Sequence, residues 1–148
     1  MTRYNENSVE VRLPSRLGYE RIAMGTAASM AKLMGFSEDR IQDLKTAVAE
    51  ACINAIEHGN QMNAAVPVGV ILSMPHPGEL EVKVLDDGSG MNTPAPKPDI
   101  DRKMTGEERA RGMGMFLIQS LVDEVEWVPS VEGQSFVRLV IRMDKESA

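Results

Sequence analysis

The chain has 148 residues and a formal charge of −6, from 16 Lys and Arg against 22 Asp and Glu; this suits one compact domain and argues against a protein that grips nucleic-acid phosphate, which needs clustered Lys and Arg. One cysteine and two histidines leave little for a disulfide framework or a zinc site. No apolar run approaches the roughly 20 residues that a membrane helix needs. The N-terminus is polar and has no apolar core of the kind found in a signal peptide. We therefore expect a single cytoplasmic domain over residues 1–148, with no membrane segment and no direct contact with nucleic acid.

The first half of the chain predicts a strand followed by two helices. Residues 8–13 alternate apolar and polar side chains, as in a half-buried strand. Apolar side chains then recur at helical spacing over 16–34, with Ser15 placed to cap this helix and Gly35 to stop it. Ser37 opens a second helix that should end near residues 58–60. Its apolar stripe comprises Ile41, Leu44, Val48, Ala51, Ala55 and Ile56.

The second half predicts a hairpin, a long loop, a short helix and a final pair of strands. The glycine- and proline-rich loop, 87–111, is unusually long for a compact domain, and such loops are usually functional or disordered. The order β-α-α-β-β-loop-α-β-β predicts an α+β fold, a two-layer sandwich with helices on one face of a mixed, mostly antiparallel sheet. The predicted elements are strands 66–75 and 79–86, helix 112–122, and strands 124–128 and 135–143.

Four polar residues on the second predicted helix form the first candidate site. Glu50, Asn54, Glu57 and His58 are spaced i, i+4, i+7 and i+8, so they share a face beside the apolar stripe. Such a face is most often a solvated helix edge. The functional alternative is a site in which Glu50 is a general base and Asn54 is a hard oxygen ligand for Mg²⁺.

A second candidate follows the predicted strand 79–86. Asp86 is followed by Gly88, Gly90 and Met91, and glycines at this spacing make a tight turn in which the backbone can approach a ligand closely. An Asx turn at the strand exit explains the same residues equally well.

The third candidate lies where the long loop meets the next predicted helix. Gly112 and Gly114 come directly before an apolar helix, and backbone N–H groups at a helix start form a cradle for phosphate. Arg109 and Arg111 precede them and can add charge-assisted bonds to phosphate oxygens. The alternative is a flexible loop capped into a helix.

The three candidates, in this order along the chain, resemble the Bergerat (GHKL) ATP-binding fold of gyrase, Hsp90, histidine kinases and MutL. The chain is most similar to its small single-domain branch, the RsbW-like and SpoIIAB-like anti-sigma factors, which are also serine-protein kinases. The resemblance covers roughly residues 8–143, with 50–59 similar to the family's N box and 112–125 similar to its glycine box and the junction that follows.

The resemblance assigns roles to the motif residues. Asn54 would hold Mg²⁺ between the phosphates of ATP, and Glu50 would accept the proton of the attacking hydroxyl. Asp86 would accept the adenine amino group. The family tends to carry Gly-Thr near the last strand, so Ser135 would supply the hydroxyl near adenine here.

Other assignments concern the phosphates and the loop that would close over them. Residues 91–111 would form the ATP lid, in which Arg109 or Arg111 would reach the γ-phosphate. Gly88 and Gly90 would let the strand exit pass beneath the base. The remaining nucleotide-contacting positions would be Glu57, His58, Met91, Gly112, Met113, Gly114, Met115 and Phe116.

The resemblance also implies a biological role. The protein would phosphorylate a STAS-domain anti-sigma factor antagonist, bind a sigma factor, and form a homodimer, for which the first strand is a plausible pairing edge. One alternative is a non-catalytic, nucleotide-dependent binding module that sequesters a sigma factor or another partner. Another is a detached ATPase domain of a histidine-kinase-like system.

Overall fold

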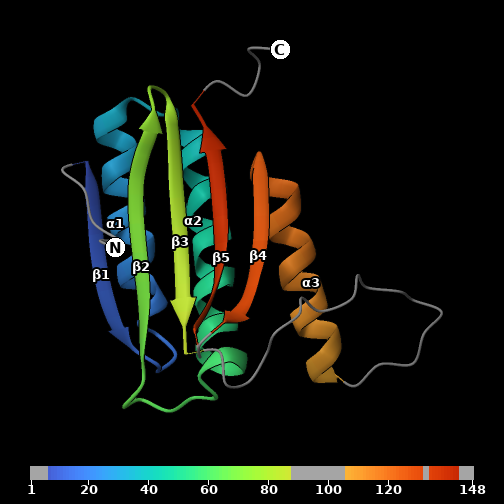
Figure 1. Ribbon diagram of the computed structural model, residues 1–148. Helices are drawn as coiled ribbons and strands as arrows, with labels where there is room; N and C mark the ends of the chain where they lie inside the picture. Colours follow the sequence, from blue (N-terminus) through green and yellow to red (C-terminus); the bar gives the residue numbers. More distant parts are fainter. Residues whose placement is uncertain (1–6, 88–105, 132–133, 144–148) are drawn as a thin grey trace.

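The computed structural model describes residues 7–87, 106–131 and 134–143. One face of a five-stranded sheet is covered by α1 and α2, while α3 packs beside α2 at the β4 side of the sheet (Figure 1). The elements are β1 (Ser8–Pro14), α1 (Glu20–Met34), α2 (Glu38–Asn54), the π-helical turn η1 (Ala55–Gly59), β2 (Pro67–His76), β3 (Glu79–Asp86), α3 (Gly106–Leu121), β4 (Glu124–Val131) and β5 (Gln134–Arg142).

The predicted element order and the two-layer α+β sandwich are confirmed. The strands lie in the order β1-β2-β3-β5-β4, so β5 inserts between β3 and β4. Each strand pairing in the described part of the chain is antiparallel, which corrects the expectation of a mixed sheet. The hairpin turn between β2 and β3 contains Gly78 with a φ of 76°, a conformation that glycine adopts without strain.

The first helix begins later than predicted. It starts at Glu20 rather than near residue 16, because a turn with Gly18 at a φ of 108° precedes it. Ser15 does not cap it: the Ser15 hydroxyl instead donates to the carbonyl of Val66, the residue before β2. The predicted stop is confirmed, since Gly35 caps the helix in the left-handed conformation with a φ of 97°.

The second helix begins as predicted and widens at its end. The Ser37 hydroxyl accepts a hydrogen bond of 3.2 Å from the Arg40 backbone N–H, and the whole predicted apolar stripe is buried. After Asn54 the helix continues as η1, in which the Asn60 N–H donates to the Ala55 carbonyl at 2.8 Å. Such π turns frequently occur at functional sites.

The third helix differs most from its prediction. It begins at Gly106 rather than Gly112, and the added residues 107–111 are Glu, Arg and Ala, which are strong helix formers. Gly112 and Gly114 therefore lie inside the helix. The expectation that their N–H groups point out of a helix start is wrong for this conformation.

A buried ion pair in the first turn of α2 links the helical layer to the sheet. Arg40 is 5% exposed and its guanidinium lies 2.7 Å from the Asp123 carboxylate and 3.0 Å from Asp43. It also donates to the carbonyl of Arg142 on β5 at 3.2 Å.

Within the described residues, the structure contains no helix with the length and apolar character needed to cross a membrane.

Candidate functional site

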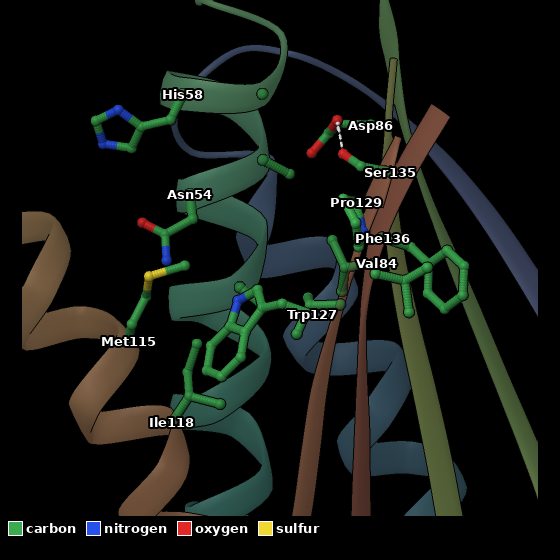
Figure 2. Close-up of a pocket in the computed structure, with 15 residues that line it drawn as sticks. Asn54, His58, Val84, Asp86, Met115, Ile118, Trp127, Pro129, Ser135 and Phe136 are labelled. Atoms are coloured by element: carbon green, nitrogen blue, oxygen red, sulfur yellow. Dashed lines mark hydrogen bonds between the residues drawn. The ribbon is translucent and has the colours of Figure 1, made fainter. Parts of the chain in front are cut away.

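A pocket with about 550 Å³ of empty space, partly open to solvent, lies between α2, α3 and the sheet. Figure 2 shows side chains from all three meeting around it. The lining residues are Ala51, Asn54, Ala55, His58, Gly59, Val84, Asp86, Met115, Ile118, Trp127, Val128, Pro129, Ser135, Phe136 and Val137.

A carboxylate and a hydroxyl lie together at one end of the pocket. Asp86 is the last residue of β3 and Ser135 is its register partner on β5. The Ser135 hydroxyl donates a hydrogen bond of 2.7 Å to Oδ1 of Asp86 (Figure 2). Gly59 lies so close to the Asp86 carboxylate that a Cβ at residue 59 would overlap it. An ionised carboxylate is a pure acceptor, so this end of the pocket fits a ligand that presents an N–H donor.

The amide of Asn54 lies in the helical wall of the pocket. Its Nδ2 is buried and has no hydrogen-bond partner among the residues that the structure describes, which is costly for a polar atom unless a ligand supplies one. In Figure 2 the amide points toward Met115 of α3. Rotation of the amide presents its oxygen in the same place, and Mg²⁺ is usually held by one or two protein oxygens plus substrate phosphates. The residues present therefore fit a phosphate-bound Mg²⁺ at Asn54.

Glu50 lies one turn before Asn54 on α2 but does not line the pocket. A Cβ built on Gly114 of α3 would lie 2.7 Å from Oε2 of Glu50, so α3 packs directly on this carboxylate. Burial, and secondarily the charge of Glu57, raise the pKa of the Glu50 carboxyl above its ordinary value of 4.5. A carboxylate with a raised pKa is a stronger proton acceptor.

Five of the residues predicted to contact nucleotide line the pocket, namely Asn54, His58, Asp86, Met115 and Ser135, but other predicted contact residues do not. Met113 and Phe116 are 51% and 48% exposed, because helical periodicity turns them away from the face that carries Met115. Glu57 is also directed outward, since the wider turn of η1 changes the angular spacing after Asn54. Gly112 and Gly114 are inside α3 and do not line the pocket.

Several predicted site residues lie outside the described part of the chain. These are Gly88, Gly90 and Met91, together with most of the predicted lid, 91–111. Arg109 and Arg111 lie on the described backbone of α3, but their side chains are outside the description.

The apolar wall of the pocket was missed by motif reasoning. Trp127 alternates with Val125 on β4, which predicts only sheet packing, yet the structure places it in the pocket between the helices and the sheet. Ile118 of α3 and Val84 of β3 complete this wall. Cys52 on α2 is fully buried, and burial raises the pKa of its thiol to about 12. An apolar wall with a carboxylate at one end suits a flat heterocycle that carries an amino group.

The family comparison covers nearly the whole sheet and helical layer. Residues 13–141 match the model of the histidine kinase-like ATPase domain. The chain is 32% identical over 126 residues to the serine-protein kinase RsbW of Bacillus licheniformis, covering 79% of this chain and 75% of that relative. It is 30% identical over 125 residues to the RsbW of Bacillus subtilis strain 168, covering 82% and 78% of the two chains.

A solved structure supports the same fold. The RsbU and RsbW domains of Rv1364c from Mycobacterium tuberculosis superimpose with a TM-score of 0.67 and 18% identity. The match covers 95% of this chain and 34% of that one, so this chain spans about a third of that protein. Together with the family match and the curated relatives, these findings show that the chain belongs to the histidine kinase-like ATPase family, among its RsbW-type serine-protein kinases.

Proposed function

We propose that this protein is an ATP-dependent serine-protein kinase and anti-sigma factor that phosphorylates a STAS-type anti-sigma factor antagonist. The observation that carries the proposal is the pocket itself. It has an amino-group acceptor at one end, Asp86 with Ser135, and in its helical wall the buried Nδ2 of Asn54, which has no hydrogen-bond partner among the described residues. The names of the curated relatives support the kinase activity.

The pocket suggests how ATP would lie. The N6 amino group of adenine donates to Asp86, and the base rests against the apolar wall that includes Trp127 and Ile118. The phosphates extend toward Asn54. Bound Mg²⁺ would neutralise phosphate charge there, with Asn54 as its protein ligand.

Glu50 is the proposed general base. The serine oxygen of the antagonist attacks the γ-phosphorus, the bond from that phosphorus to the β–γ bridging oxygen breaks, and ADP leaves. The serine proton passes to the Glu50 carboxylate. The chain supplies position and charge for this transfer, which is the usual contribution of a protein to phosphoryl transfer.

The remaining parts of the proposal concern partners and location. A sigma factor is the proposed target of sequestration, and the antagonist competes for the protein when it is not phosphorylated. We also propose a cytoplasmic homodimer, with the edge strand β1 as the pairing edge. Light scattering of the purified protein measures its oligomeric state, and fractionation of cells measures its location.

The central experiment measures nucleotide binding and transfer separately. Trp127 is the single tryptophan and lines the pocket, so its fluorescence should change when Mg-ATP binds. Incubation with Mg-ATP and a candidate STAS protein should then label a serine of that protein. Glu50→Gln should keep the fluorescence response and lose the labelling. If the wild-type chain labels no serine and Glu50→Gln leaves partner binding intact, the protein is a nucleotide-dependent binding module instead of a kinase.

A further inference from the structure

The residue that follows the η1 turn, Asn60, is buried and holds three separate segments of the chain together. It is 4% exposed. Its Nδ2 donates to the Ser15 hydroxyl at 2.9 Å and to the carbonyls of Pro67 at 3.2 Å and Val66 at 3.4 Å. Its Oδ1 accepts a hydrogen bond of 2.8 Å from the backbone N–H of Asp87. With acceptors around its nitrogen and a donor at its oxygen, the Asn60 amide has one favoured orientation.

The bond to Asp87 acts at the point where β3 leaves the sheet. The pairing of β3 with β2 runs to Leu85, opposite Gly69, and does not include Asp86 or Asp87. On the β5 side, Asp86 pairs with Ser135. The side-chain oxygen of Asn60, just after the η1 turn, therefore accepts a hydrogen bond from the backbone N–H of Asp87 at a point where β2 no longer pairs with β3.

Asp86 is thus held from three directions. The Ser135 hydroxyl bonds its Oδ1, and Gly59 abuts its carboxylate with no room for a Cβ. Asn60, the neighbour of Gly59, fixes the backbone of the residue that follows Asp86. A hydrogen bond between a carboxylate and a ligand amino group depends strongly on direction, so a strand exit that pivots would misalign it.

We propose that Asn60 is a positioning residue for nucleotide selectivity, which aims the Asp86 carboxylate at the amino group of the base by fixing the Asp87 backbone. This inference rests on the proposed function, because it takes ATP as the ligand and Asp86 as the acceptor of its amino group. Asn60 itself does not line the pocket, so its proposed role is to position Asp86 and not to contact the nucleotide.

The test compares ATP with purine riboside triphosphate, which lacks the exocyclic amino group. Trp127 fluorescence gives the dissociation constant of each nucleotide with Mg²⁺ present. The wild-type chain should prefer ATP by about tenfold or more, because purine riboside triphosphate cannot form the hydrogen bond to the charged Asp86 carboxylate. Asn60→Ala should reduce this preference at least about threefold, and in an Asp86→Asn background it should change the preference no further.

Two control variants separate positioning from stability. Ser15→Ala removes bonds on the far side of the Asn60 amide but leaves the Asp87 contact, so it should lower thermal stability and keep the preference for ATP. Asn63→Ala removes an exposed hydrogen bond that the Asn63 side chain accepts from the Ala65 N–H in the same loop. It should change neither the thermal stability nor the preference for ATP. Should Asn60→Ala fail to fold, hydrogen exchange of the wild-type chain still applies: the Asp87 amide should be protected.

The outcomes are distinct. An unchanged preference in folded Asn60→Ala, or a rapidly exchanging Asp87 amide in the wild-type chain, overturns the positioning role while ATP binding stands. A wild-type chain that binds neither nucleotide overturns the proposed function and this inference with it.

Discussion

The hydroxyl of Ser135 donates a hydrogen bond of 2.7 Å to Oδ1 of Asp86, across the antiparallel pair of β3 and β5. Ser135 is 7% exposed, so this bond lies largely out of water. The sheet register places the two side chains opposite each other, 49 residues apart in the sequence. The carboxylate is therefore oriented before any ligand arrives, which reduces the cost of binding.

Ser135→Ala should weaken ATP binding about tenfold, because a hydrogen bond to a charged group contributes roughly 1.5–3 kcal/mol. Ser135→Thr keeps the hydroxyl and should bind ATP nearly as well as the wild-type chain. Titration with Trp127 fluorescence measures both. Ser73→Ala is the matched control, since Ser73 bonds Glu81 at 3.5 Å on the same sheet and does not line the pocket. Equal losses for Ser73→Ala and Ser135→Ala would contradict the assignment.

Gly114→Ala should slow phosphoryl transfer about tenfold or more without lowering stability. The new Cβ would lie 2.7 Å from Oε2 of Glu50, and a flexible carboxylate can move away at little cost. Ala also favours a helix over Gly by roughly 0.5–1 kcal/mol, whereas a displaced general base loses part of its roughly 10²–10⁴-fold effect. Gly25→Ala on α1 meets open space and should stabilise the chain with no effect on transfer. Transfer at the wild-type rate in Gly114→Ala would count against Glu50 as the base.

Glu50→Gln should make the chain more stable at neutral pH. Burial raises the pKa of Glu50, so the folded chain holds its proton more tightly than the unfolded chain. The protonated Glu50 carboxyl makes its whole contribution to the free energy of unfolding below pH 4.5. That contribution is lost as the pH rises through the raised pKa of the folded chain. Thermal melting should therefore show Glu50→Gln above the wild type at pH 7 and close to it at pH 4.

The control for this pH effect is Glu57→Gln, which removes the charge of Glu57, the smaller of the two causes that raise the pKa of Glu50. It should stabilise the chain less than Glu50→Gln does, because desolvation by burial is the larger cause. A gain for Glu50→Gln that stays constant from pH 4 to pH 7 would show that ionisation is not its source.

Arg40→Ala should lower the free energy of unfolding by about 3–5 kcal/mol, because it leaves the Asp123 carboxylate without its buried partner. Arg142→Ala provides the comparison. Its side chain is 43% exposed, so solvent screens its ion pairs to Glu79 and Glu124 and a much smaller loss than for Arg40→Ala is expected. Urea denaturation measures both, and similar losses would refute the distinction between buried and exposed pairs.

The sequence determined the element order and the apolar stripe of α2, because periodicity and turn residues are local properties. The resemblance to a known family, and not periodicity, pointed to Asn54, Asp86 and Ser135. It placed the start of α3 wrongly: the glycines at 112 and 114 read as a boundary, yet the helix formers before them continue the helix. It likewise assigned Ser15 to a helix cap, although the Ser15 hydroxyl donates to the carbonyl of Val66, just before β2.

Only the tertiary structure decided which polar side chains meet. Sheet register joins Asp86 to Ser135, and the approach of α3 places Gly114 on Glu50. The π turn directs Glu57 outward and brings Asn60 to Asp87. These contacts join residues 27 to 64 positions apart in the chain, for example Asn60 with Asp87 and Glu50 with Gly114. A spacing pattern reports one element at a time, whereas such contacts depend on how the elements pack together.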